Sequence, residues 1–353
     1  CWQQFRGIGG WGLVCCSRAL VQSLVSLSDI SAKSRRRNIR RARSDEPSSS
    51  NKAHRAMSAL REALATSPLA RELLARTRFP VVAHLHCAVS GGADSLALLL
   101  LASMTTTPTT AWHVDHSLRA GSHHEFATVR DVATALGIEA RSCTVTVEPG
   151  ANLEARARAA RYGALPTGVL TGHTADDQAE TVLINLLRGS GTAGLAAMRH
   201  DQRPLLGLRR TETQRLCAEV GVTALHDPMN DDNSFQRVRV RTELLPQLNE
   251  IARRDMVDVL VRQADMLRAD DDLLNELAAT IDISDAHALA NAPVALARRA
   301  VRRWLANPLP PDSATVERVL AVARGEMPGC DIGEGRQVRR SRQRLMIRDN
   351  NVV

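Results

Sequence analysis

The chain has 353 residues and a formal net charge of +8, because 46 Lys and Arg residues stand against 38 Asp and Glu residues. Hydrophobic residues make up 44% of it and charged residues 24%, which is typical of a globular protein and excludes disorder of the whole chain. The charge is unevenly placed, since residues 1–56 hold 11 basic and three acidic side chains and residues 57–353 hold 35 of each. The positive charge therefore belongs to an N-terminal segment and not to a basic domain.

Lysine and cysteine usage narrows the chemistry of residues 57–353. The only lysines are Lys33 and Lys52, so the main body has no lysine amine for a Schiff base, a lysyl-adenylate or a Walker-A phosphate loop. Its four cysteines are isolated, which indicates a reducing compartment and excludes a C-x-x-C zinc or iron–sulfur site. The longest apolar run, at 96–102, is far shorter than the about 20 residues of a membrane helix. We expect a cytoplasmic protein without a membrane partner.

Residues 1–56 combine a weak apolar stretch with a basic run at 33–41 and show neither a helical nor a strand period. They also lack the order of features that a signal peptide has. We expect the natural start at Met57 and treat 1–56 as a disordered or non-native extension. The alternative is a basic arm that binds RNA.

From Met57 onward, short apolar runs alternate with helical stretches. In chain order, the pattern predicts strands at 81–89, 110–114, 142–147 and 168–171, each followed in turn by a helix at 95–103, 122–136, 152–162 and 174–188. This alternation predicts an α/β fold, with a parallel sheet covered by helices on both faces and a ligand site at the carboxyl ends of the strands. Residues 235–330 show helical spacing, so we expect a first domain over 57–230 and a smaller, mostly α-helical domain over 231–353.

The strongest motif joins the first predicted strand to an apolar helix and consists of Ser90, Gly91, Gly92, Ala93, Asp94 and Ser95. Paired glycines let backbone N–H groups face outward, and the helix N-terminus adds partial positive charge, so the segment can form a phosphate cradle. Both serine hydroxyls can donate to the same anion. A glycine-rich turn with a capping side chain is the structural alternative. The motif resembles the PP-loop of N-type ATP pyrophosphatases, which cleave ATP between its α and β phosphates and need no lysine in this loop.

The predicted helix at 174–188 gathers carboxylates near its start. Asp177 and Glu180 are three residues apart and therefore share a face. Arg188 follows Asp177 by eleven residues, close to three turns, so it projects from a similar face. A capping box formed by Thr174 and Asp177 is the structural alternative. It does not explain why Gly172 and a histidine stand directly before the helix at a strand end.

A further polar group, His113, Asp115, His116 and Arg119, lies at the end of the predicted strand at 110–114. Asp115 could hold Mg²⁺ there, and a turn with solvated histidines is the alternative. The H-V-D-H-S-L-R segment resembles a signature of the tRNA(Ile)-lysidine synthetase family, whose members are PP-loop enzymes. Further family-like segments follow in order at 152–158, 161–162, 171–181, 187–191, 203–206, 227–230 and 237–246. The resemblance covers about residues 81–250.

The resemblance implies a Rossmann-like PP-loop catalytic domain, a tRNA-binding helical domain, and a ligase that uses ATP. It joins free L-lysine to carbon 2 of the wobble cytidine of tRNA(Ile) with a CAU anticodon, through an adenylated tRNA, and releases AMP and pyrophosphate. Residues 90–95 would bind ATP, with Asp94 and Asp115 as ligands of Mg²⁺. Asp177 and Glu180 would bind and deprotonate the cationic lysine, and Arg188 would stabilise charge at the α-phosphate.

Arginines are the expected RNA contacts, because aromatic residues are scarce. Arg237, Arg239 and Arg241 would contact tRNA, although Val238 stands where the family usually has asparagine. A charged helix face is the alternative for these three. A second cluster, with the same alternatives of a backbone-binding patch or solvated surface, comprises Arg336, Arg339, Arg340, Arg342, Arg344 and Arg348.

Two other functions remain open at this point. Another PP-loop tRNA-modifying enzyme, such as a thiolase, would need paired cysteines, which the chain lacks. A non-catalytic ATP-fold protein that binds RNA is the second alternative. We also allow for a homodimer.

Overall fold

The computed structural model describes residues 49–115, 122–145, 153–226, 231–306 and 310–349. Residues 53–353 form one compact unit, and the description below concerns it. The expectation about 1–56 falls almost wholly outside the described residues. Two helices, α2 (Ser49–Thr66) and α3 (Pro68–Arg76), precede the first strand.

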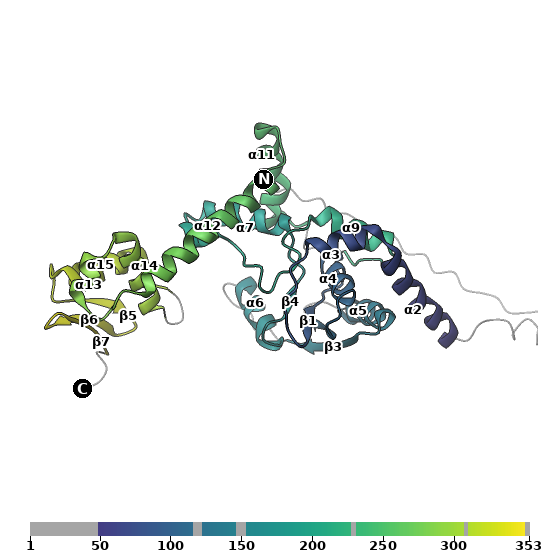
Figure 1. Ribbon diagram of the computed structural model, residues 1–353, viewed down its shortest axis with the longest axis horizontal. Helices are drawn as coiled ribbons and strands as arrows, with labels where there is room; N and C mark the ends of the chain where they lie inside the picture. The colour runs from purple at the N-terminus through teal and green to yellow at the C-terminus, as the bar shows by residue number, and fades with distance from the viewer. Residues whose placement is uncertain (1–48, 116–121, 146–152, 227–230, 307–309, 350–353) are drawn as a thin grey trace, which may run out of the picture. The chain divides into compact units, whose positions relative to one another are not determined.

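Four parallel strands form the first sheet, in the order β3–β2–β1–β4 (Figure 1). They are β1 (Leu85–Ala88), β2 (Thr109–Asp115), β3 (Glu139–Thr144) and β4 (Leu170–Thr171). The chain adds β2 and β3 on one side of β1 and then returns to place β4 on the other side. Ligands bind at such a switch point, outside the carboxyl ends of the strands. The segments that follow β1 and β4 therefore meet at the expected ligand site.

A helix follows each of these strands, as the sequence predicts: α4 (Ala93–Ser103), α5 (Ser122–Leu136), α6 (Leu153–Ala164) and α7 (Ala175–Leu187). Helix α4 carries the apolar run 96–102, and every residue of that run is fully buried. The first strand is shorter than predicted, because Val81 is fully exposed and pairing with β2 starts only at Leu85. The third begins three residues early, because its ladder with β2 starts at Glu139. The α/β fold with a parallel sheet is confirmed.

Helices dominate the region between the two sheets. They are α8 (Thr192–Leu195), α9 (Arg210–Glu219), α10 (Gln236–Arg239), the π-helix η2 (Val240–Leu244), α11 (Leu245–Ala252), α12 (Met256–Ala279), α13 (Ala286–Asn291), α14 (Val294–Leu305) and α15 (Ser313–Arg324). One apolar core joins α7 to η2, α11 and α12. Helix α7 thus packs against segments on the far side of residue 230, and the predicted boundary there stays a prediction.

The chain ends in a three-stranded antiparallel sheet that the sequence analysis did not anticipate. Its strands are β5 (Gly329–Gly333), β6 (Arg336–Ser341) and β7 (Arg344–Asp349). Helices α13, α14 and α15 pack on one face of it, against Val338 and Leu345 (Figure 1). The expected mostly helical domain therefore carries a small sheet. Its arginine-rich strands were interpreted from the sequence as a charged surface. Among the described residues, no helix has the length and apolar character of a membrane span.

Candidate active site

The loop between β1 and α4 has a backbone that only glycine adopts easily. Gly91 has a φ of +92°, and a Cβ atom at this position would lie 2.7 Å from Cδ1 of Leu225. The Ser95 hydroxyl is buried, donates to the Gly92 carbonyl at 2.8 Å and accepts from the Ser90 N–H at 3.1 Å. The side chain of Ser90 is exposed, with its Oγ 3.2 Å from Oγ of Ser95. Ser95 therefore holds the loop from within, and Ser90 is the hydroxyl that can reach an anion.

The carboxyl end of β4 lies directly against this loop. A Cβ atom on Gly172 would come within 2.6 Å of the Asp94 carbonyl oxygen and 2.9 Å of the Ser95 backbone nitrogen. These are backbone atoms at the start of α4, which cannot yield as a flexible side chain would. Glycine is required at 172 because two functional segments touch there.

Asp177 is the carboxylate nearest the start of α7. Its Oδ2 accepts from the Thr174 N–H at 2.9 Å and from the Thr174 hydroxyl at 3.0 Å, which agrees with the capping interpretation. Its Oδ1 accepts from Arg210 at 2.9 Å. Burial disfavours the charged form, but Arg210, His173 and Thr174 outweigh it and hold the pKa of Asp177 below its ordinary value. Asp177 is therefore ionised at neutral pH.

Arg210, the first residue of α9, links three carboxylates. Its guanidinium lies 2.9 Å from Asp177, 3.2 Å from Glu180 and 3.4 Å from Asp94. Burial opposes its charge, yet the surrounding carboxylates outweigh burial and raise its pKa above the ordinary value. Arg210 therefore joins the loop after β1 to the acidic face of α7.

Asp94 differs from Asp177 in its electrostatic surroundings. Burial, together with repulsion from Asp177, raises the pKa of Asp94 to about 6, although hydrogen bonds from Thr213 and Arg210 act in the opposite direction. Both aspartates contact Arg210, but the pKa of Asp94 is raised and that of Asp177 is lowered. Such a pair of differently tuned carboxylates is typical of a functional site.

Glu180 is fully buried and is surrounded by arginines. Arg241 donates to its Oε1 at 2.7 Å, Arg210 lies 3.2 Å from the same oxygen, and Arg237 lies 3.4 Å from Oε2. Three guanidinium groups compensate one carboxylate that has no contact with water. Glu180 is thus an anchor that brings α9, α10 and η2 onto α7.

Two family models match the chain. The PP-loop domain matches residues 63–248, and the TilS substrate binding domain matches residues 285–346. Three similar relatives are each named tRNA(Ile)-lysidine synthase. That of Nocardia farcinica is 45% identical over 62% of this chain and 74% of its own length. That of Mycolicibacterium paratuberculosis is 46% identical over 62% and 73%, and that of Mycobacterium bovis 42% identical over 69% and 81%. This chain belongs to the tRNA(Ile)-lysidine synthase family.

The three arginines predicted to contact RNA have two orientations, and their role in tRNA binding stays a prediction. Residues 237 and 241 are four apart on continuous helical backbone, so both face Glu180, and Arg237 also donates to the Thr181 hydroxyl at 2.9 Å. Arg239 lies on another face and pairs with Glu243 at 3.1 Å. Of these three arginines, only Arg239 has a mostly exposed side chain.

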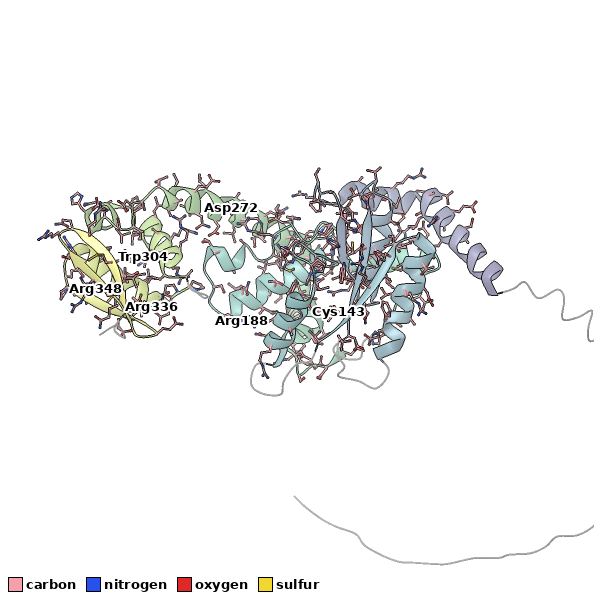
Figure 2. The ribbon with its side chains drawn as sticks, turned by 90° about the horizontal axis from the view of Figure 1, so that it is seen from below. Cys143, Arg188, Asp272, Trp304, Arg336 and Arg348 are labelled. Atoms are coloured by element: carbon pink, nitrogen blue, oxygen red, sulfur yellow. The ribbon has the colours of Figure 1, made fainter. Side chains whose placement is uncertain are left out.

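Arg188 does not meet the carboxylates of α7. It is exposed at the carboxyl end of the helix, about 16 Å along the axis from Asp177 at 1.5 Å per residue (Figure 2). The predicted common face is compatible with the helix, but a distance of three turns separates the groups. Arg188 is therefore available to a substrate that reaches across α7, and its role stays a prediction.

Asp115 is the last residue of β2 and is half-buried. Neighbouring parallel strands end at the same edge, so Asp115 and the loop after β1 share the carboxyl side of the sheet. His116 and Arg119 lie outside the described residues. Within the described residues, no three His, Cys, Asp or Glu side chains gather as a ready metal site.

Sequence reasoning missed Arg210 and its neighbour Arg209, which pairs with Asp176 at 3.2 Å and Asp255 at 2.5 Å. The sequence does contain a signal that could have identified them. The helix dipole disfavours cations at a helix start, yet two consecutive arginines stand there. Such a conflict between local preference and sequence indicates a tertiary requirement. Here that requirement is a cluster of carboxylates on other elements.

Proposed function

We propose that the protein forms lysidine in tRNA(Ile) with a CAU anticodon, from ATP and free L-lysine, by way of an adenylated tRNA. The observation that carries the proposal is the meeting of the PP-loop and the acidic start of α7 through Arg210. Both segments lie at the switch point of the sheet, inside the region that matches the PP-loop family model. An ATP-binding loop and carboxylates that can receive a cationic lysine are two requirements of this reaction, beside the binding of tRNA.

In the first step, the loop 90–95 binds the phosphates of ATP. The first N–H groups of α4 have no acceptor within the helix, and the dipole adds partial positive charge, so a departing pyrophosphate is stabilised there. The exposed Ser90 hydroxyl adds a donor. The oxygen at carbon 2 of the cytidine attacks the α-phosphate, and the bond between the α and β phosphates breaks. We propose that Arg188 approaches the α-phosphate once the substrates are bound.

The donors present fit a magnesium ion. Mg²⁺ in nucleotide sites is commonly held by one or two carboxylates together with phosphates and water. Asp94 is largely buried and protonates readily, a condition that a bound cation reverses. Asp94 and Asp115 would hold the ion, which would neutralise charge on the phosphates of ATP.

In the second step, the ε-amine of lysine attacks carbon 2 and AMP leaves. Free lysine is cationic, so its amine must be held and must lose a proton before it attacks. Asp177 and Glu180, two acidic groups on one helix face, are the residues predicted for this step. Their exposure suggests different roles, because 13% of the Asp177 side chain is exposed and none of the Glu180 side chain is. We propose that Asp177 contacts the ammonium group and that Glu180 acts through the arginines that surround it.

The test uses purified protein with ATP, labelled lysine and total tRNA. We expect ATP-dependent label in tRNA(Ile) alone, and loss of label with Asp177→Asn. Exposed Asp270→Asn on α12, outside both matched domains, is the matched control and should keep full activity. ATP-insensitive tRNA binding without label would support the non-catalytic alternative, and modified tRNA without lysine would support another PP-loop enzyme. Gel filtration of the same protein tests the homodimer.

A further inference from the structure

His113 belongs to the polar group at the end of β2, and the proposed reaction steps do not use it. It lies two residues before Asp115, and only 1% of its surface is exposed. Its ring packs beside that of Phe126 on α5, with 5.9 Å between the ring centroids. A polar ring at this depth must find its hydrogen-bond partners within the protein. Its contacts therefore indicate its role.

One ring nitrogen of His113 binds the backbone directly before the loop 90–95. Strand β1 ends at Ala88, which pairs with Trp112 on β2. Val89 follows this last pair, and its carbonyl oxygen lies 2.9 Å from Nδ1 of His113. The Val89 N–H donates to the Trp112 carbonyl at 2.7 Å. Two consecutive residues of β2 therefore hold both backbone polar groups of the residue that leads into the loop.

This contact determines which nitrogen of the ring carries the hydrogen. A carbonyl oxygen can only accept, so Nδ1 of His113 donates to Val89. Nε2 is buried and has no hydrogen-bond partner among the residues that the structure describes. The other tautomer would bury an N–H without an acceptor and would leave the Val89 carbonyl without its donor, and both losses are costly. The surroundings therefore select the Nδ1–H form of His113.

A single peptide group carries this contact into the loop. The Val89 carbonyl and the Ser90 N–H belong to the same planar unit. The Ser90 N–H donates to Oγ of Ser95 at 3.1 Å, and that hydroxyl donates to the Gly92 carbonyl at 2.8 Å. The peptide plane is thus held at its carbonyl end from β2 and at its N–H end from α4. A chain of hydrogen bonds runs from His113 to the start of α4 and fixes the backbone from which the exposed Ser90 side chain extends.

We propose that His113 is a positioning residue for ATP. It orients the loop 90–95 through the Val89 carbonyl, so that the loop N–H groups and the Ser90 hydroxyl meet the phosphates. The proposal rests on the proposed function only in taking this loop as the ATP site. Donors stabilise a departing pyrophosphate best when they need no rearrangement during the reaction. The buried ring supplies this order, because its own orientation is restricted by Phe126 and by burial.

Two variants of the full chain separate the roles of the two ring nitrogens. Asparagine can place an amide N–H where His113 has Nδ1, whereas glutamine can place one only near the position of Nε2. In calorimetry with ATP and Mg²⁺, His113→Gln should weaken ATP binding by about tenfold, as expected for a lost hydrogen bond to a buried carbonyl, and His113→Asn should stay within about threefold of wild type. Wild-type affinity in the glutamine variant, or an equal loss in both variants, overturns the proposal.

His86 on β1 provides the matched control. Its Nδ1 accepts from the Trp112 indole N–H at 3.2 Å, and Trp112 is not part of the loop. His86→Gln removes the same ring from the neighbouring strand and should leave the affinity for ATP unchanged. If the control variant loses as much affinity as His113→Gln, the effect is a general one of the sheet and the proposal is wrong.

A measurement on the wild-type chain keeps the test decisive if a variant at 113 does not fold. Nitrogen-15 NMR distinguishes a histidine ring with hydrogen on Nδ1 from one with hydrogen on Nε2. The assigned His113 signals should show the Nδ1–H form with and without ATP, and the Nε2–H form overturns the proposal. The predicted affinities in a protein that incorporates no lysine into tRNA would support the role of His113 and contradict the proposed function. Wild-type protein that binds no ATP would overturn the role of His113.

Discussion

Replacing Asp94 by asparagine should stabilise the ligand-free protein while abolishing its activity. Burial raises the pKa of Asp94 from 3.8 to about 6. A shift of about two units corresponds to about 3 kcal/mol, at 1.36 kcal/mol per unit, that the folded state loses when this carboxylate ionises. Asparagine has the shape of the protonated acid and carries no charge. Asp94→Asn should therefore raise the free energy of unfolding by about 3 kcal/mol at pH 8.

The pH dependence follows from the direction of the shift. Because the pKa of Asp94 is higher in the folded state, its favourable contribution is complete below about pH 4, where both states are protonated. It is lost as pH rises through 6, because the unfolded chain releases this proton first. The stability difference between variant and wild type should be near zero at pH 4, grow between pH 4 and 6, and stay constant above.

Urea unfolding of both proteins from pH 4 to 8, without Mg²⁺ and ATP, measures this difference. Asp270→Asn is the control, because Asp270 on α12 is exposed and should give no such gain. A difference that is flat with pH, or a variant less stable than wild type at pH 8, would refute the reasoning. The same Asp94 variant should lack tRNA-dependent exchange between ATP and pyrophosphate.

Three further variants test other parts of the site. Glu180→Gln should lower the free energy of unfolding by about 3 kcal/mol, measured in urea, since it leaves three half-buried guanidinium groups without their buried carboxylate. Gly172→Ala should cost about 1–3 kcal/mol and weaken ATP binding in calorimetry, because its Cβ would meet the backbone of Asp94. Gly163→Ala in α6, with no atom near its Cβ, is its control and should be neutral or stabilising. Arg188→Ala should abolish tRNA-dependent ATP–pyrophosphate exchange with the unfolding free energy within about 0.5 kcal/mol of wild type, and full exchange would remove Arg188 from the mechanism.

The sequence predicts the parallel sheet well, because its signals are local. An apolar strand, a glycine pair and an apolar helix follow one another around residues 90–95, and helix α5 has the predicted bounds. The three strands near the C-terminus were not predicted, because they are short and show no clear alternation: β6 has a single apolar residue, and the apolar residues of β7 are consecutive. Such runs indicate a charged surface as readily as a strand.

The site is less predictable, because its decisive contacts are distant in sequence. Asp177 and Glu180 are visible as neighbours on one helix, but their cationic partner Arg210 is about 30 residues away. The alternation of Arg237 and Arg241 with valines gave no sign that both arginines would face a buried glutamate. Spacing along one element fixes a face, and tertiary packing decides what that face meets.

The buried Glu180 has a consequence for any attempt to divide this protein. Two of its three guanidinium partners, Arg237 and Arg241, come from beyond residue 230, and the core around α7 is completed by η2, α11 and α12. A fragment that stops at residue 230 would retain Arg210, but it would expose Glu180, which is fully buried in the whole chain. The smallest piece expected to fold and use ATP therefore extends through α12. The ATP-binding sheet and the helices beyond it should therefore unfold as one cooperative unit.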